Sequence, residues 1–153
     1  MLEPQPEFSN IPDDAIRFLP HSGPALLVTK TLEMSADHMV CLARFPARNA
    51  LVSDGYVPSY AAVEPAAQTA AVHQALVAIA KGVELKELSG FLTSLKRLTI
   101  HQPSLPADTD LTVKVMPRGH IRGLSKYTFQ LSVGTALACE GEFSSFVQNE
   151  LGT

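Results

Sequence analysis

The clearest pattern in the chain is an apolar, alanine-rich segment between residues 59 and 81. Of the 21 residues from Tyr60 to Ala80, 15 are apolar and nine are alanine. The apolar positions spread around most of a helical circumference, which is typical of a helix enclosed by the rest of a protein. Ser59 is a candidate N-cap and Gly82 a stop signal, so the pattern predicts one long buried helix over residues 59–81.

Strand-like segments lie on both sides of this helix. Apolar and polar residues alternate in part, and turn residues separate the runs. The predicted strands are residues 25–34 and 38–45 before the helix, and residues 91–100, 110–117, 124–133 and 136–147 after it. Residues 46–58, with a proline at each end, are predicted to be a loop. Two strands, one helix and four strands fit an antiparallel sheet that curls around a central helix, an α+β fold.

The chain length favours a single domain over residues 1–153. A domain of 153 residues can bury a substantial core without disulfides or metals. Residues 1–10 are predicted to form a loose arm, and residues 12–18 a short helix. The net charge is −3 and 46% of residues are hydrophobic, as in an ordinary soluble protein with a weak tendency to self-associate.

Several classes of protein are disfavoured by the sequence. The first ten residues, MLEPQPEFSN, lack the basic start of a secretory signal, which leads us to expect a cytoplasmic protein. A membrane span is disfavoured because the alanine-rich segment contains Glu64, Pro65 and His73. Cys41 and Cys139 form no C-x-x-C motif, so we expect two small buried hydrophobic residues and no metal site.

A basic stretch stands out in the second half of the chain. No Asp or Glu occurs from residue 111 to residue 139, whereas Lys114, Arg118, Arg122 and Lys126 all fall there, together with His120. A solvated hairpin explains this cluster, as does a docking surface for an acidic partner or a phosphate. Nucleic acid is disfavoured because no series of aromatic residues accompanies the basic ones.

Glu64 is the residue of the helix that most needs an explanation. A carboxylate buried among alanines without a partner is costly, and such groups often mark functional sites. Gln68 lies one turn later and ~40° around the helix, where it can orient the carboxylate or bind a carbonyl oxygen. Pro65 removes one helical N–H and leaves a carbonyl near residue 61 free.

Four stretches resemble the bacterial 3-hydroxyacyl-acyl-carrier-protein dehydratases of the hotdog fold, in particular a divergent branch of aryl-polyene-type clusters. They are LPHSGPALLV, VPSYAAVEPAAQTA with the Glu64 and Gln68 pair, FLTSLKRLTIHQPSLPAD and LSVGTALACEGEFSSFV. The resemblance implies a dimer whose sheets join, with sites at the interface built from a histidine of one subunit and the helix acid of the other. It implies a substrate on the phosphopantetheine of acyl-carrier protein or of CoA, and no metal or organic cofactor.

One feature of the family is missing from this chain. The family's catalytic histidine lies eight residues before the proline of its Pro-Gly turn, which here is Ala50, and Ser59 replaces the glycine. Phe45-Pro46 resembles the end of the family's His-Phe-Pro motif, but Arg44 precedes it. Dehydration requires a base at the carbon next to the thioester and an acid at the leaving hydroxyl, and a histidine suits this work.

The other histidines are weak substitutes. His73 follows Glu64 by nine residues, which places it on the opposite side of the helix. His38 and His120 fall in a predicted turn and loop and are expected to be exposed, and the role of His101 at a strand end is open. His21 is expected to make structural hydrogen bonds rather than to act in chemistry.

Asp54 is a further candidate for a second carboxylate near Glu64. It belongs to the loop segment SDGYVP, and two carboxylates in different environments can divide acid and base roles. An Asp-Gly turn with an Asx hydrogen bond is the simpler explanation of this residue.

Three functions remain open from the sequence. The first is a dehydratase-like subunit with Glu64, Gln68 and Asp54 as catalytic candidates, acting alone, as a homodimer or with a histidine-bearing hotdog partner. The second is an acyl thioesterase in which Glu64 activates water or attacks the thioester. The third is a non-catalytic subunit that holds a carrier protein through Arg118, Arg122 and Lys126.

Overall fold

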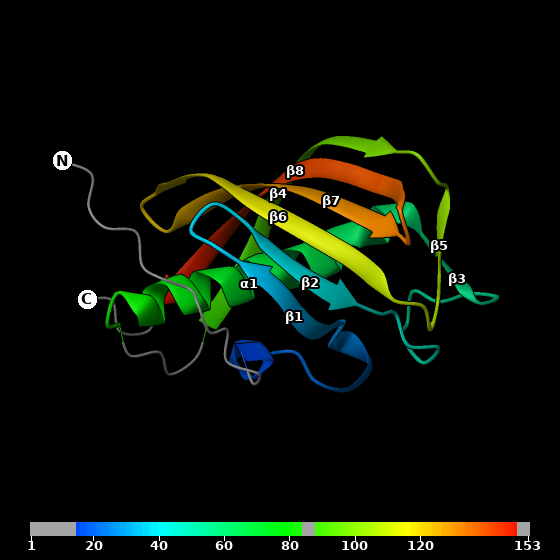
Figure 1. The fold of residues 1–153 in the computed structure, drawn as a ribbon, viewed down its shortest axis with the longest axis horizontal. Coiled ribbons are helices and arrows are strands. Elements are labelled where there is room, and N and C mark those ends of the chain that lie inside the picture. Colours follow the sequence, from blue (N-terminus) through cyan, green and yellow to red (C-terminus); the bar gives the residue numbers. More distant parts are fainter. Residues whose placement is uncertain (1–14, 84–87, 150–153) are drawn as a thin grey trace.

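The computed structural model describes residues 15–83 and 88–149 of the chain, and shows a curved antiparallel sheet lying against one long helix (Figure 1). The predicted arm and the first residues of the predicted short helix lie outside these ranges. The strands are β1 (Val28–Met34), β2 (Met39–Ala43), β3 (Tyr56–Pro58), β4 (Leu88–Ile100), β5 (Ser104–Pro106), β6 (Leu111–Ile121), β7 (Leu124–Val133) and β8 (Ala136–Asn149). The helices are α1 (Val63–Ala80) and the 3₁₀ turns η1 (Ala15–Phe18), η2 (Gly23–Ala25) and η3 (Ser59–Ala62).

Six strands form the main sheet in the order β1-β2-β6-β7-β8-β4, with every neighbouring pair antiparallel. This arrangement confirms the predicted sheet around a central helix. All six predicted strands are present, with bounds shifted by a few residues. The prediction missed a second, two-stranded sheet of β3 and β5, because segments of three residues carry too little alternation to be recognised.

The largest difference concerns the segment PRGHIRG, predicted to be a turn. β6 continues through most of it to Ile121, and a two-residue turn at Arg122 and Gly123 leads into β7. Both turn residues have positive φ (51° and 83°), as a type I′ hairpin turn requires. His120 therefore belongs to a strand rather than a loop, and its Nδ1 lies 2.7 Å from Ser125 Oγ.

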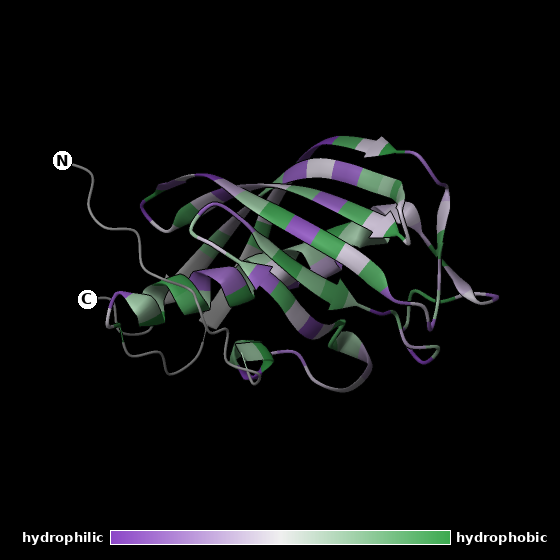
Figure 2. Ribbon diagram, in the orientation of Figure 1, coloured by the Kyte–Doolittle hydropathy of each residue, from purple (hydrophilic) through white to green (hydrophobic). Residues whose placement is uncertain are grey.

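The core lies between α1 and the inner face of the sheet. Side chains alternate between buried and more exposed along β6 and β7, and this alternation is visible as changing hydropathy in Figure 2. Alanines on α1 allow the helix to approach the sheet closely, and Phe45, Phe129 and Phe143 fill the larger spaces. No helix among the described residues is long and apolar enough to cross a membrane.

The helix itself differs from the expectation in two ways. The α-helical part begins at Val63, because residues Ser59 to Ala62 form the tighter 3₁₀ turn η3. The helix is also not enclosed on all sides, since a less buried stripe runs along it at regular helical spacing. The stripe consists of Tyr60, Glu64, Ala67, Ala71, Gln74 and Ala78.

His73 lies on the opposite, buried side of α1 and ties the helix to the β1–β2 turn. Its side chain is 3% exposed, Nε2 donates to the Ser35 carbonyl at 2.9 Å, and Nδ1 lies 3.4 Å from the Tyr127 hydroxyl. Burial lowers the pKa of His73 below its ordinary 6.5 and raises that of Tyr127 to about 12. The predicted turn from Ser35 to Asp37 is confirmed by a hydrogen bond from Ser35 N to His38 O.

His73 predicts a specific acid sensitivity of the fold. Because its pKa is lower in the folded chain than in the unfolded one, stability present above pH 6.5 is lost as the pH falls from 6.5 toward the folded pKa. Replacing His73 with Gln should flatten the dependence of the unfolding free energy on pH below 6.5, relative to wild type. Urea unfolding at several pH values measures this slope.

Asp37, His38 and Tyr127 are the titratable groups that influence or contact His73, and they are unchanged in this variant. The matched control is His120→Gln, at an exposed position, which should keep the wild-type slope. Equal slopes in wild type and in His73→Gln would contradict the assignment.

Candidate functional site

Gln68 fastens α1 to the start of β1. Its Oε1 accepts hydrogen bonds from Leu27 N at 2.9 Å and Val28 N at 3.2 Å, and its Nε2 donates to the Ala25 carbonyl at 2.8 Å. The side chain is 1% exposed. Since backbone groups occupy both ends of the amide, the expectation that Gln68 orients Glu64 or binds a substrate carbonyl gains no support from these contacts.

Glu64 is exposed, so the expectation of a buried carboxylate was wrong. The reason is the later start of the helix: Glu64 is the second residue of α1 and lies on the less buried stripe. In the first turn the helix dipole favours a carboxylate, and the missing N–H of Pro65 is one that would lack a helical partner anyway. Among residues 15–83 and 88–149, no side chain forms a recorded hydrogen bond or ion pair with Glu64.

The η3 turn holds the start of α1 against the segment that follows β4. Ser59 is buried rather than acting as a helix cap: its amide donates to Pro103 O at 3.2 Å and its hydroxyl donates to Gln102 O. Tyr60, the next residue, is 57% exposed. The sequence had placed Tyr60 among the enclosed apolar residues, although its position four residues before Glu64 puts both on one face of the helix.

Asp54 occupies the tip of a tight turn. Asp54 and Gly55 have φ of 52° and 80°, and Ser53 and Tyr56 exchange backbone hydrogen bonds of 2.9 and 3.1 Å. The Asp-Gly turn is therefore present, and the segment is a hydrogen-bonded hairpin rather than a free loop. Asp54 is exposed, and a catalytic role for it stays a prediction.

The loop that contains Ala50 is firmly attached to its surroundings. The backbone N–H of Asp108 donates to the Phe45 carbonyl at 2.8 Å, and the Asp108 carboxylate accepts from the backbone N–H of Ala47. Arg44 forms an ion pair with Asp110 at 2.9 Å. The Asn49 side-chain amide donates to the Pro24 carbonyl. Ala50, at the family's histidine position, is exposed. This loop is thus ordered but carries no imidazole.

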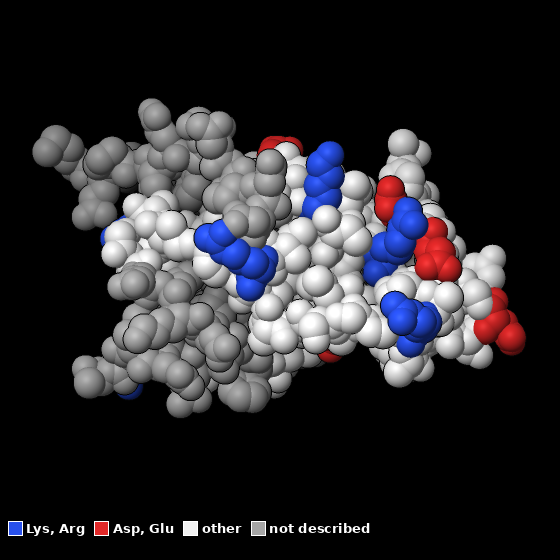
Figure 3. All heavy atoms as spheres, turned by 90° about the horizontal axis from the view of Figure 1, so that it is seen from below, with Lys and Arg blue, Asp and Glu red and all other residues white. Residues whose placement is uncertain are grey.

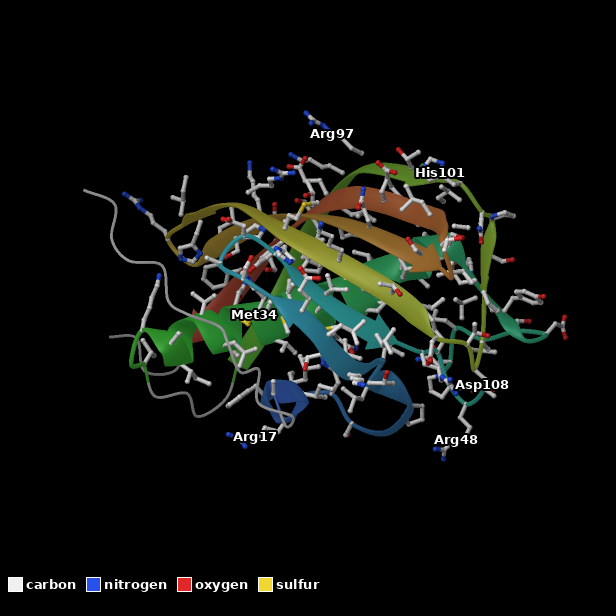
Figure 4. All side chains as sticks on the ribbon, in the orientation of Figure 1. Arg17, Met34, Arg48, Arg97, His101 and Asp108 are labelled. Atoms are coloured by element: carbon white, nitrogen blue, oxygen red, sulfur yellow. The ribbon has the colours of Figure 1, made fainter. Side chains whose placement is uncertain are left out.

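No described histidine has a recorded contact with Glu64. His38 pairs with Glu33 at 2.6 Å and also contacts Ser35, so it is not a free surface residue. His101 pairs with Glu140 at 3.1 Å and extends from the end of β4 away from α1 (Figure 4). The structure therefore places no imidazole of the residues it describes within hydrogen-bond reach of the candidate carboxylate Glu64.

His21 is the least explained of the histidines. It lies in the turn before η2, and its Nδ1 is buried without a hydrogen-bond partner. The expected structural hydrogen bond through this atom is thus absent.

The basic residues lie on the β6–β7 hairpin. Arg118 and Arg122 are exposed, Lys126 is exposed and pairs in register with Gly119, and Arg118 Nε donates to Thr128 Oγ1 at 3.2 Å. None of the three pairs with a carboxylate among the described residues. The hairpin tip and the start of α1 lie at opposite ends of the molecule (Figure 1), because β6 spans ~33 Å from the β5 end to its turn.

Charge is distributed differently on the lower face of the molecule. Figure 3 shows lysine and arginine side chains lying apart from one another there, several beside acidic ones. The part of this face that Figure 3 leaves uncovered by grey atoms carries both basic and acidic side chains.

The two cysteines are buried, lie away from Glu64 in the sequence and are not activated as thiolates. Burial raises the pKa of Cys41 to about 12 and that of Cys139 above its usual value, so both are poor nucleophiles. Within the described part of the chain, no three His, Cys, Asp or Glu side chains gather in a group able to hold a metal ion.

The sheet curved around one long helix, with a carboxylate in the first turn of that helix, defines the chain as a hotdog-fold protein. The chain belongs to the ApeP-like family, described as ApeP dehydratase, which matches over residues 14–153. The predicted relationship to divergent hotdog dehydratases is thereby confirmed.

Three solved structures show how far the likeness of fold extends. The dehydratase heterocomplex ApeI:P from Xenorhabdus doucetiae is similar with a TM-score of 0.78 and 18% identity, over 90% of this chain and 92% of that one. An HP0420 homologue from Helicobacter felis gives 0.59 and 12% over 92% and 93%, and a hypothetical thioesterase from Streptococcus pneumoniae with coenzyme A gives 0.55 and 16% over 78% and 85%. No curated protein sequence matches the chain.

The Gln68 contacts predict a structural rather than catalytic effect of its loss. In Gln68→Ala, two backbone N–H groups and one carbonyl lose their partners in a buried place, which should lower the unfolding free energy by about 2–4 kcal/mol. Gln68→Glu should be intermediate, since a carboxylate accepts both N–H bonds but cannot donate to Ala25 O. Urea unfolding measures both variants.

The matched control is Gln130→Ala, at an exposed position of β7, which should stay within about 0.5 kcal/mol of wild type. Wild-type stability of Gln68→Ala combined with lost activity would instead support the original expectation of a catalytic Gln68.

Proposed function

We propose that this chain is one subunit of a 3-hydroxyacyl dehydratase whose acid–base pair is completed by a histidine from a second hotdog subunit. The observation that carries the proposal is the exposed Glu64 at the start of α1 in a dehydratase-family chain that has alanine at the histidine position. The substrate is a 3-hydroxyacyl chain on the phosphopantetheine of a carrier protein, with CoA thioesters as analogues.

The position of Glu64 supports a site shared between subunits. Tyr60 and Glu64 start the less buried stripe of α1, and Ser59 bonds directly to Gln102 and Pro103 just beyond β4. The carboxylate of Glu64 therefore lies near the end of β4, the outer strand of the sheet. A second subunit that joins this strand can reach the carboxylate. The small alanines that continue the stripe leave room along the helix for an acyl chain.

The chemistry divides between the two subunits. The partner's imidazole removes a proton from C2 of the substrate, the C2–C3 double bond forms, and the C3–O bond breaks. The carboxyl group of Glu64 gives a proton to the departing hydroxyl, which leaves as water. Covering Glu64 with a second subunit excludes bulk water from the site, so the proton passes between the carboxyl group and the departing hydroxyl rather than to solvent.

The ApeI:P heterocomplex is a precedent for a two-subunit arrangement. That complex is named a dehydratase heterocomplex, and this chain matches one of its chains over nearly its full length. The likeness to a thioesterase structure concerns the fold alone and does not decide the reaction. Release of free thiol from the thioester is therefore measured as the alternative outcome of the activity test.

The proposal predicts that Glu64 matters only in the assembled complex. This chain and a histidine-bearing hotdog subunit together should convert a 3-hydroxyacyl carrier protein to the enoyl form. The loss of one water is detected by intact-protein mass spectrometry. This chain alone should give little product. Glu64→Gln should lower the rate of the complex by roughly 10²-fold or more. The unfolding midpoint of the Glu64→Gln chain should stay near that of the wild-type chain because Glu64 is exposed.

The control variant Glu33→Gln removes an exposed carboxylate near the turn between β1 and β2. It should leave the dehydration rate of the complex unchanged. Full activity of the chain alone, retained in Glu64→Gln, would sink the proposal. Release of free thiol without dehydration, lost in Glu64→Gln, would replace it with the thioesterase.

We further propose that the basic β6–β7 hairpin receives the acidic carrier protein. If sheets of two subunits join antiparallel at their edges, the hairpin of one subunit comes toward the end of the other where α1 begins. A carrier bound at Arg118, Arg122 and Lys126 then delivers its chain across the interface, which accounts for the distance between this hairpin and Glu64 of the same chain.

Carrier binding should therefore depend on salt and on the hairpin. Arg118→Ala combined with Arg122→Ala should weaken binding of an acidic carrier protein about tenfold at low salt, and less as salt screens the charges, in a titration by fluorescence anisotropy. Arg48→Ala is the control, since Arg48 is exposed at the far end of the molecule (Figure 4). Binding that ignores both salt and the double substitution would assign the carrier to another surface.

A further inference from the structure

The free edge of the main sheet is long and apolar. β4 is the last strand of the sheet, 13 residues long, and pairs with β8 on one side only within the described part of the chain. Leu92, Leu95 and Ile100 are 44%, 37% and 47% exposed on it. An uncovered edge of this kind is a template for another strand, so we expect a second sheet to join here.

The edge is interrupted by an unusual bulge at Arg97. Lys96 pairs with Glu142 and Thr99 with Glu140, so Arg97 and Leu98 together stand opposite Gly141 alone. Arg97 has φ of 54°, a left-handed conformation that favours glycine and is unfavourable for arginine. A residue that keeps an unfavourable conformation on an exposed edge calls for a function of its side chain.

Gly141 shows that the bulge is built into the sheet. A Cβ atom at this position would lie 3.1 Å from a ring carbon of Phe129 and 3.4 Å from Leu98 Cα. The opposing strand therefore has the residue that leaves space for the bulged backbone.

Arg97 is available to a partner. Its side chain is 86% exposed and extends away from the body of the molecule (Figure 4). The one ion pair recorded for it, to Glu142 Oε2, is long at 3.8 Å and weak at such exposure. Lys96 precedes it, and the strand from Leu88 to Ile100 contains no Asp or Glu.

This composition distinguishes between possible partners of the edge. In a symmetric dimer both edges are the same surface, so the β4 strand of a second copy brings Lys96 and Arg97 but no carboxylate to the bulge, and the nearby Glu142 of each copy already pairs with its own Arg97. A different subunit with an acidic edge offers a charge-assisted partner for the guanidinium.

We propose that Arg97 selects the partner of this chain: the β4 edge joins the sheet of a different, histidine-bearing hotdog subunit that places a carboxylate against Arg97, in preference to a second copy. This inference rests on the two-subunit dehydratase proposed above. It adds the residue that decides which subunit is accepted.

The test compares three substitutions of Arg97. Lysine keeps the positive charge, glutamate reverses it, and glycine removes the side chain while it favours the left-handed backbone conformation. The probe is a histidine-bearing hotdog subunit from the same organism, and native mass spectrometry over a dilution series gives the dissociation constants of heterodimer and homodimer. Arg97→Lys should stay within about threefold of wild type, whereas Arg97→Glu should weaken the heterodimer at least tenfold. Lys30→Glu, an equal charge change on the opposite edge strand β1, should have no effect.

Arg97→Gly separates the partner role from a structural one. Glycine relieves the left-handed conformation, so the unfolding midpoint of the isolated chain should stay or rise while the heterodimer weakens about tenfold. Unchanged association in Arg97→Gly and Arg97→Glu would overturn the inference, as would a wild-type homodimer tighter than the heterodimer.

The two proposals fail in different ways. An active complex whose assembly ignores Arg97 overturns the partner selection and leaves the shared dehydratase site intact. A complex that assembles through Arg97 but dehydrates no 3-hydroxyacyl carrier overturns the proposed reaction and leaves the partner selection intact.

Discussion

The three backbone hydrogen bonds of Gln68 fix the relation between helix and sheet. They join the end of η2 and the start of β1 to the second turn of α1, and so hold one side of the helix toward the core. With Gln68 and His73 directed into the protein, the stripe that starts at Tyr60 and Glu64 is turned outward. A buried amide with every group satisfied is a rigid connection, because breaking it leaves polar backbone atoms without partners away from water.

This orientation makes a single chain incomplete in two places. Glu64 stands exposed at the start of the helix without an imidazole, and β4 stands at the sheet edge without a neighbouring strand. The η3 turn connects the two, because Ser59 bonds to the residues immediately after β4. On the proposal made here, a second subunit that joins the edge approaches the carboxylate as well, and one short turn then links assembly to catalysis.

The membership in a dehydratase family and the missing histidine are consistent once the unit of function is a pair of chains. The loop held by Asp108, Arg44 and Asn49 is well ordered and has alanine at position 50, where the resemblance places a histidine. Such a chain gains nothing from pairing with itself if each site needs one histidine. The selection of a different partner that we propose for Arg97 would serve this need, since a specific pairing depends on contacts that disfavour the wrong partner.

The sequence by itself determined the order of strands and helix, the ends of most strands and the family. Alternation, glycine turns and the alanine-rich segment are local signals, and they act within a few residues. Only the tertiary structure decided that Glu64 is exposed, that Gln68 is occupied by backbone groups of residues 25 to 28, and that Arg97 bulges from a free edge. Burial, hydrogen-bond partners and register depend on residues distant in the chain, and the start of α1 shifted from Ser59 to Val63 because Ser59 bonds to residues more than 40 positions away. That shift is the reason why an acid predicted to be buried is exposed instead.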